Sequence, residues 1–289
     1  MFDNVESFHR PTSIREALRL LQSGKGQARV VAGGTDVVVE ADRSTRILID
    51  LTRTGLDYIR RGTRTTVIGA TATMVALERS PHIRALAGGL LAHAAATCGS
   101  PQIRNLATIG GNISSASPAA EVPAALAALD AVVSVATSAG RRRLPLLQYL
   151  AGARAGDFRR AILVEIVIPD PPRSKRAAWS FQKFGRTAVD ISIVNAAAGL
   201  QIAANGRVKW ARIALGAVGP TPLRIPAAEV LLTGRILDQT ALAEACAEVE
   251  RDISPISDQR ASAGYRRELS RVLASRAIED CAEKIGWRI

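Results

Sequence analysis

Aromatic residues are scarce in this chain of 289 residues, since Phe, Trp and Tyr together make up 4% of it. The hydrophobic core must therefore be built from Ala, Leu, Ile and Val, and a nucleic-acid surface based on base stacking has few rings to use. Hydrophobic residues reach 47% and charged residues 22%, which is the composition of a folded chain. The length suffices for two ordinary domains.

Cysteine is also scarce, and the three cysteines, Cys98, Cys246 and Cys281, show no CxxC spacing. Because zinc and iron–sulfur sites need clustered thiolates, the sequence predicts no metal site. The odd number fits a reducing compartment. No apolar run approaches the ~18 residues of a membrane span, and residues 1–6 lack the basic and apolar regions of a signal peptide. We therefore expect a cytoplasmic protein without a membrane span.

Acidic residues are too few to balance the basic ones, so the net charge is +12. A basic excess can indicate nucleic acid, an anionic membrane or an acidic partner. Here the arginines are spread along the whole chain, and the densest run, at residues 141–143, is three residues long. This pattern favours a solvated surface turn at that run, with a contact to a partner as the alternative.

In the first part of the chain strands alternate with helices, which predicts a mixed α/β first domain within a chain of the α+β class. A capping box at residues 13–16 begins a helix. Further helices are predicted at residues 73–79, 83–96 and 120–128, and strands at residues 29–32, 47–51, 67–69, 131–135 and 161–168. Residues 98–119 are rich in Gly, Ser, Asn and Pro and are predicted to form a long loop, which in a compact domain is usually functional.

Residues 169–173, PDPPR, break regular structure, and the pattern changes after them. Strands are predicted at residues 179–184, 190–202 and 208–217, followed by helices at residues 227–232, 240–250 and 264–285. The dipeptide Asn205-Gly206 predicts a hairpin with a type I′ turn. We therefore expect a first domain at residues 1–172 and a smaller α+β domain at residues 173–289, with a three-stranded antiparallel sheet and helices.

Two glycine pairs are the most informative motifs, AGGTD at residues 32–36 and TIGGN at residues 108–112. Glycine lacks a Cβ, so backbone N–H groups can approach a ligand closely. Successive N–H groups form a nest for an anion such as a diphosphate. The spacing is not the G-x-G-x-x-G of a Rossmann motif, and no P-loop Lys-Ser/Thr follows. Taken alone, each pair is more often a simple tight turn.

The residues around these turns resemble a known family. The second turn lies within SPQIRNLATIGGNI at residues 100–113, and ASPAAE follows at residues 116–121. This arrangement resembles the flavin-binding subunits of the molybdenum hydroxylases, such as the medium chain of carbon monoxide dehydrogenase and the flavin domain of xanthine dehydrogenase. The resemblance continues in GPTPLR at residues 219–224 and in SPISDQRASAGYRR at residues 254–267, so it spans nearly the whole chain.

The resemblance implies a two-part FAD-binding domain of the vanillyl-alcohol-oxidase (PCMH) type, followed by a domain like the carbon monoxide dehydrogenase flavoprotein C-terminal domain. It implies that FAD is held by two diphosphate loops. The first loop would be Val30, Val31, Ala32, Gly33, Gly34, Thr35, Asp36 and Val37, and the second Thr108, Ile109, Gly110, Gly111 and Asn112.

Three further residues match family positions. Glu121 stands where the family has an aspartate near the adenosine or ribose end of FAD, and Leu163 matches a leucine with an apolar or main-chain contact. Lys183 matches a lysine near the flavin, where a cation would stabilise the anionic reduced cofactor. The alternative for Lys183 is an outward-facing lysine on a strand. No catalytic residue and no metal ligand is implied in this chain.

The implied function is electron transfer. Electrons would pass from a small subunit with two [2Fe–2S] clusters to FAD in this chain and then to NAD, oxygen or a quinone, while a molybdopterin-containing large subunit hydroxylates the substrate. The assembly implied is a dimer of heterotrimers. One alternative is a stand-alone FAD-dependent oxidoreductase. Another is a basic, non-catalytic binding module, for example for nucleic acid, which is supported only by the net charge of +12.

Overall fold

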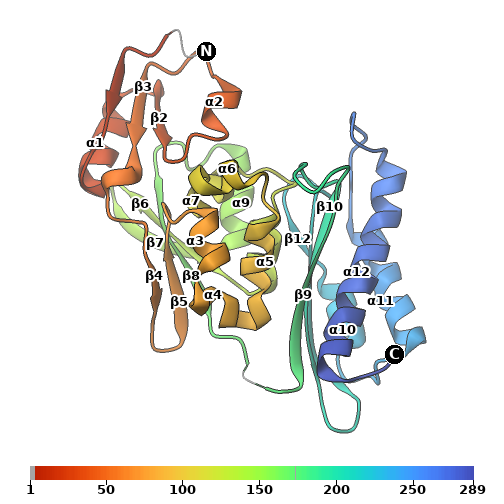
Figure 1. The fold of residues 1–289 in the computed structure, drawn as a ribbon. Coiled ribbons are helices and arrows are strands. Elements are labelled where there is room, and N and C mark those ends of the chain that lie inside the picture. Colours follow the sequence, from red (N-terminus) through yellow and green to blue (C-terminus); the bar gives the residue numbers. More distant parts are fainter. Residues whose placement is uncertain (1–3, 173) are drawn as a thin grey trace. The chain divides into compact units, whose positions relative to one another are not determined.

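The computed structural model describes residues 4–172 and 174–289 (Figure 1). The chain forms two compact units that interleave in sequence. The first unit runs to Leu77 and adds Ser100–Ala116 and Ala131–Pro169, and the second contains Glu78–Gly99, Ser117–Asp130 and the chain from Asp170 to the C-terminus. Residues 1–3, part of the region predicted to lack a signal peptide, and Arg173, part of the predicted linker, lie outside the described residues.

The first unit begins with a three-stranded parallel sheet in the order β1-β3-β2. Its strands are β1 (Ser7–His9), β2 (Ala28–Val31) and β3 (Ile47–Asp50). Helix α1 (Ile14–Ser23) begins at the predicted capping box, because the Ser13 hydroxyl accepts a hydrogen bond from the Glu16 amide. Ala17 and Leu21 of α1 pack with Ile49, so one face of the helix closes the small core.

A five-stranded antiparallel sheet follows in the first unit, in the order β4-β5-β8-β6-β7. Its strands are β4 (Ile59–Arg61), β5 (Thr65–Gly69), β6 (Val132–Thr137), β7 (Gly140–Pro145) and β8 (Ile162–Pro169). The prediction of a surface turn at residues 141–143 is wrong, because these arginines lie in the edge strand β7. The predicted exposure of their side chains is confirmed. Charged side chains on an edge strand discourage pairing with another chain.

The predicted loop at residues 98–119 is largely helical. Helix α6 (Pro101–Leu106) begins after Ser100, whose hydroxyl caps it, and α7 (Ile109–Ser114) begins after Thr108 in the same way. Ser followed by Pro, and Thr two residues before the glycine pair, are helix-start signals. The sequence composition concealed them, because Gly, Asn and Pro are poor helix formers.

The single helix predicted at residues 83–96 is also wrong. The chain instead forms α4 (Pro81–Ala85), a 3-10 turn at Leu86–Gly89, and α5 (Leu90–Ala96). Three successive residues, Ala87, Gly88 and Gly89, have positive φ, which ends one helix and redirects the chain into the next.

The second unit contains a four-stranded antiparallel sheet in the order β12-β11-β10-β9. Its strands are β9 (Ala177–Phe184), β10 (Val194–Ile202), β11 (Val208–Gly216) and β12 (Leu223–Arg224). The three long strands were predicted, and β12 makes four. The hairpin at Asn205-Gly206 is confirmed, but only Gly206 has positive φ, and its amide bonds to the Ala203 carbonyl, so the turn is not type I′.

Helices flank this sheet within the second unit. Helices α10 (Pro226–Leu232), α11 (Gln239–Asp252) and α12 (Ala263–Ile285) correspond to the three predicted helices. The alternate residues of β10 from Val194 to Ile202 pack with the apolar faces of α11 and α12 to form the main core. The other side of β10 contacts α8 (Glu121–Ala128), which is apolar almost all round and fully buried.

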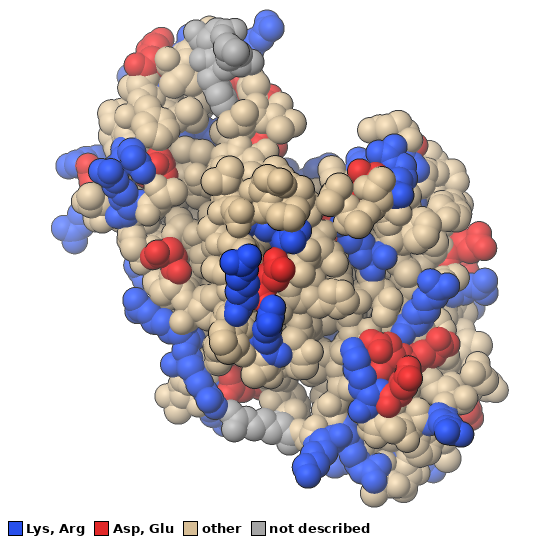
Figure 2. All heavy atoms as spheres, in the orientation of Figure 1, with Lys and Arg blue, Asp and Glu red and all other residues tan. Residues whose placement is uncertain are grey.

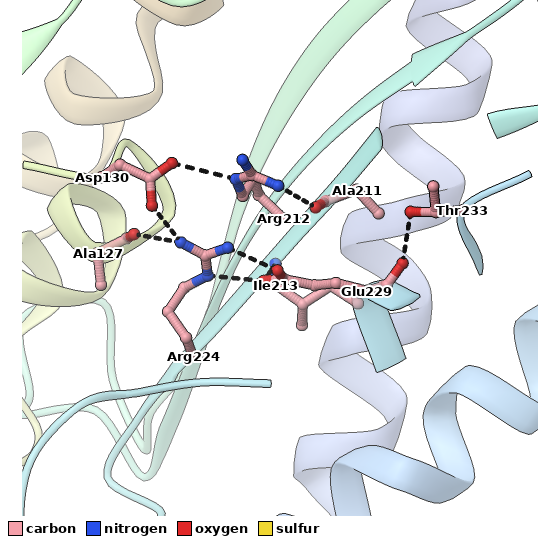
Figure 3. Close-up of polar contacts among 8 residues, drawn as sticks. All are labelled: Ala127, Asp130, Ala211, Arg212, Ile213, Arg224, Glu229 and Thr233. Carbon is pink, nitrogen blue, oxygen red and sulfur yellow. Dashed lines mark hydrogen bonds and ion pairs between the residues drawn. The ribbon is translucent and has the colours of Figure 1, made fainter. Parts of the chain in front are cut away.

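Arg224 ties α8 to the sheet of the second unit (Figure 3). Its guanidinium makes a bidentate pair with Glu229 at 2.6 Å for each bond, and also donates to the Ala127 carbonyl and to Asp130. Glu229 also accepts the Ile213 amide at 2.9 Å. The arginine of GPTPLR therefore joins the C-terminal end of α8, strand β11 and helix α10.

The second half of the family-like C-terminal run forms a similar joint. Arg266 is buried and donates to Asp258 at 2.8 Å and to the Ile193 carbonyl before β10. Burial alone would raise the pKa of Asp258, but the Arg260 amide, the Arg266 guanidinium and the Ala261 amide outweigh it and lower the pKa to about 2.

Replacing Arg224 by Met should destabilise the chain strongly, because Glu229 would stay buried without its cation. We expect a loss of roughly 3–5 kcal/mol in the free energy of unfolding, measured by urea denaturation. The matched control is Arg212→Met, which breaks an exposed pair with Asp130 and should cost about 0–1 kcal/mol. Equal losses in the two variants would contradict the role given to Arg224.

Acid should weaken the joint at Asp258. The pKa of this carboxyl is lower in the folded chain than its ordinary value of 3.8, so its stabilisation is present above about pH 4 and is lost as the pH falls through about 2. The stability difference between the wild type and Asp258→Asn should therefore shrink over this range. Denaturation curves at several pH values measure it, and a constant difference would disprove this linkage.

Candidate functional site

The first glycine turn connects β2 to the short helix α2 (Val37–Glu40). Val30 and Val31 end the strand, residues 32–36 form the turn, and Val37 opens the helix. Gly34 has φ +73°, a conformation that favours glycine. Within the described chain, no acceptor receives the amide N–H of Gly33, Gly34, Thr35 or Asp36. The turn therefore offers four successive main-chain donors, as an anion nest requires.

The two glycine turns are linked by a close backbone contact. A Cβ on Gly33 would lie 1.8 Å from the carbonyl oxygen of Leu106, just before the second turn. Likewise, a Cβ on Gly110 would lie 2.6 Å from both the Cβ and the carbonyl oxygen of Ala70. These two glycines are therefore required by the packing of the chain itself. Gly34 and Gly111 are different, because the space beside them is largely open.

The amides of the second turn are already used inside the first unit. Ile109 donates to Ala72 at 2.9 Å and Gly110 to Ala70 at 2.8 Å. Gly111 donates to the Thr108 hydroxyl at 3.1 Å, and Asn112 donates to the Thr108 carbonyl at 3.0 Å. The expectation of bare amides at both turns therefore needs correction: free main-chain donors are present at the first turn, whereas the second presents the Thr108 hydroxyl and the exposed backbone of Gly111.

Two unsatisfied oxygen atoms flank the second turn. The Thr71 hydroxyl and the Asn112 side-chain oxygen are buried, and neither has a hydrogen-bond partner among the described residues. Thr71 lies between Ala70 and Ala72, whose carbonyls hold the turn. Buried polar atoms without partners are rare in folded chains, so this part of the first unit fits a polar molecule or water that completes its hydrogen bonding.

Leu163, the last residue expected in the first unit's part of the site, lies near the start of β8 opposite Val135. Its side chain is buried, so it belongs to the packing of the sheet. Any contact with a ligand through Leu163 would therefore use its main chain, which is one of the two contacts that the family resemblance implies.

Glu121 and Lys183 lie together in the second unit. The Lys183 ammonium is 2.9 Å from a carboxylate oxygen of Glu121 and donates to the Thr97 carbonyl at 2.7 Å, and both side chains are more than nine-tenths buried. The alternative of an outward-facing lysine is therefore wrong. Two residues expected near different parts of one extended cofactor are in direct contact, so they share a single location.

Sequence reasoning did not find the polar residues that support this ion pair. The Ser192 hydroxyl donates to Glu121 at 2.8 Å, and the Asn195 amide donates to the Ala119 carbonyl at 3.3 Å. Both side chains are fully buried. The only signal in the sequence is the presence of Ser192 and Asn195 in the otherwise apolar run of residues 191–200, before and within β10. Arg186 and Asp190, between β9 and β10, form a separate ion pair at 3.2 Å that is exposed.

Basic side chains do not gather into one field on the surface seen in Figure 2, where acidic residues lie among them. Several of the cations are engaged in ion pairs, including Arg10, Arg46 and Arg235. Among the described residues, no helix combines the length and the apolar character needed to cross a membrane.

Comparison with known proteins covers the chain in two parts. Residues 2–171 match the family described as the FAD binding domain in molybdopterin dehydrogenase, and residues 179–281 match the carbon monoxide dehydrogenase flavoprotein C-terminal domain. The change between the two families falls at the PDPPR segment. The predicted α+β architecture, with an FAD-binding domain followed by a domain with an antiparallel sheet and helices, is thereby confirmed.

Curated relatives extend along nearly the whole chain. The 6-hydroxypseudooxynicotine dehydrogenase complex subunit alpha of Paenarthrobacter nicotinovorans is 33% identical, over 92% of this chain and 90% of that protein. The carbon monoxide dehydrogenase medium chain of Afipia carboxidovorans is also 33% identical, over 94% of this chain and 95% of that protein.

Solved structures agree with these relatives. A chain of the carbon monoxide dehydrogenase from Hydrogenophaga pseudoflava has a TM-score of 0.88 at 30% identity and covers 97% of this chain and 98% of its own length. A chain of quinoline 2-oxidoreductase from Pseudomonas putida 86 has a TM-score of 0.86 at 28% identity, with coverage of 97% and 98%. The chain therefore belongs to the FAD-binding flavoprotein family of the molybdopterin dehydrogenases.

Proposed function

We propose that this chain holds FAD noncovalently and passes electrons from the iron–sulfur clusters of a partner subunit to an external acceptor. The single observation that supports this most strongly is the nest of four amides at residues 33–36, in a chain whose family binds FAD. When bound, FAD supplies the redox chemistry, and the residues of the chain supply binding, orientation and charge.

The cofactor diphosphate is proposed to lie at the first turn. The N–H groups of residues 33–36 donate to its oxygens, which needs no lysine. The Thr108 hydroxyl adds a donor, because its oxygen accepts from Gly111 and its proton has no acceptor in the described part of the chain. The remaining proposed contacts from the two loops and β8 are Val30, Val31, Ala32, Val37, Ile109, Gly110, Gly111, Asn112 and Leu163.

The ion pair of Glu121 and Lys183 is proposed to contact the same cofactor. Glu121 neutralises the buried ammonium, which would otherwise be costly to desolvate. A partly neutralised cation can still stabilise negative charge on the reduced cofactor through a charge-assisted hydrogen bond. Ser192 keeps the carboxylate in place by donating to the same oxygen that faces Lys183.

The proposed partners are a small subunit with two [2Fe–2S] clusters and a molybdopterin-containing large subunit, arranged as a dimer of heterotrimers. Support comes from the family resemblance and from relatives that are named as subunits or medium chains of dehydrogenases. The acceptor is NAD, oxygen or a quinone. We place the complex in the cytoplasm, since the three cysteines are buried and no disulfide joins them within the described residues, as in a reducing compartment.

Gly111→Val should weaken FAD binding without unfolding the protein. The added Cβ meets only the Thr108 hydroxyl, at 3.1 Å, and Gly111 is exposed, so the valine would occupy the surface where a phosphate is proposed to approach. We expect a Kd at least roughly tenfold higher, which corresponds to about 1.4 kcal/mol. Titration of the apoprotein with FAD, followed by flavin fluorescence, measures this change.

The matched control is Gly264→Val, which also places valine near the start of a helix, at α12, with nothing within 4 Å of the new Cβ. Its Kd should equal that of the wild type. Gly110→Val is unsuitable as a test, because it forces a Cβ against the Ala70 backbone and removes the fold together with the site. Normal flavin affinity in Gly111→Val would reject the placement of the diphosphate.

Coexpression with the products of neighbouring genes separates the subunit hypothesis from a stand-alone oxidoreductase. We expect a stable three-subunit assembly whose flavin absorbance is bleached when the substrate of the complex is added, because this chain holds no hydroxylation site of its own in the proposal. The isolated, FAD-loaded chain should leave the substrate unchanged. Full substrate turnover by the isolated chain would eliminate the electron-transfer role.

A further inference from the structure

A row of three residues crosses the sheet of the second unit. Lys183 on β9 lies directly opposite Asn195 on β10, and Asn195 lies directly opposite Gly216 on β11. Directly opposed residues in an antiparallel sheet point to the same face. Asn195 lies in the middle of this row and is completely buried. Its side-chain amide is therefore out of reach of solvent and can form hydrogen bonds only with groups inside the protein.

The segment 117–121 is held by this row. The Ala217 amide, next to Gly216, donates to the Pro118 carbonyl at 2.6 Å. The Asn195 side chain donates to the Ala119 carbonyl at 3.3 Å. Two residues further along, the Glu121 carboxylate meets the Lys183 ammonium at 2.9 Å. The row, together with the adjacent Ala217, therefore holds Pro118, Ala119 and Glu121 of one segment.

Two features, one at the last residue of β11 and one just after it, accommodate this arrangement. A Cβ on Gly216 would lie 2.6 and 2.7 Å from the oxygen and nitrogen of the Asn195 amide, so only glycine leaves room for that side chain. Ala217 has φ +66°, a left-handed conformation that is strained for a residue with a Cβ. Such strain persists when the surrounding structure fixes it, here through the hydrogen bond to Pro118.

The amide of Asn195 is itself only half satisfied. Its nitrogen donates to Ala119, but its oxygen is buried without a hydrogen-bond partner in the described chain. An apolar residue of similar size would avoid this cost. The hydrogen bond from Asn195 to the Ala119 carbonyl, two residues before Glu121, offsets part of this cost and gives the buried asparagine its role.

We propose that Asn195 is a positioning residue: it sets the segment 117–121 on the sheet so that the Glu121 carboxylate is held against Lys183. This inference rests on the proposed function in one respect, the contact of Glu121 and Lys183 with FAD. The positioning itself depends only on contacts inside the second unit.

The test replaces Asn195 by Leu, which has a similar size but no donor, and compares it with Gln201→Leu. Gln201 lies on the same strand and loses one hydrogen bond, from Trp210 at 2.6 Å, away from the segment 117–121. Hydrogen exchange of the Ala217 amide and the labelling rate of the Lys183 ammonium by acetic anhydride report on the segment. FAD titration reports on the cofactor.

Asn195→Leu should raise both the exchange rate of Ala217 and the labelling rate of Lys183 several-fold, and should weaken FAD binding about tenfold, whereas Gln201→Leu should change none of them. Faster exchange and labelling with unchanged FAD affinity would support the positioning role and contradict the contact of the ion pair with FAD. Exchange and labelling no faster than in Gln201→Leu would overturn the inference. Asn195→Ser, which is smaller and cannot reach Ala119, gives the same expectations if the Leu variant does not fold.

Discussion

The absence of a side chain at Gly33 and Gly110 is the constraint on which the first unit depends. At Gly33 the backbone of the first turn packs against Leu106, and at Gly110 the second turn packs against Ala70. A single methyl group at either position would separate the two segments in contact. The side of each turn that packs against the chain is therefore not available to a ligand. The other side offers amides without acceptors in the described chain at the first turn and the exposed backbone of Gly111 at the second.

The second unit uses ion pairs where the first uses glycine. Helix α8 is joined to the sheet at its N-terminal end by the pair of Glu121 and Lys183, and at its C-terminal end by Arg224. The two motifs of the second domain that resemble the family therefore have structural roles. Arg224 of GPTPLR joins α8 to α10, and Arg266 of the run at residues 254–267 joins α12 to the residue before β10. In our proposal the two glycine turns bind the cofactor diphosphate, whereas these arginines support the helices and strands that carry Glu121 and Lys183.

Sequence reasoning succeeded where local signals dominate. The β-branched run before Gly33 predicted β2, and the capping box at residues 13–16 predicted α1, which begins at Ile14. It failed where neighbours in space decide. Strand β7 carries Arg141–Arg143 and has no apolar alternation, because it is an exposed edge. The pairing of Glu121 with Lys183 and the incorporation of residues 78–99 and 117–130 into the second unit depend on contacts between distant segments, which no local pattern encodes.

The most direct test of the central claim is a structure of the protein with FAD bound. The account predicts the diphosphate within hydrogen-bond distance of the main-chain nitrogens of Gly33, Gly34, Thr35 and Asp36, with the Thr108 hydroxyl as a further donor and Gly33 and Gly110 still packed against Leu106 and Ala70. A diphosphate bound away from the first turn, or amides of that turn that bond only to other parts of the chain, would contradict it.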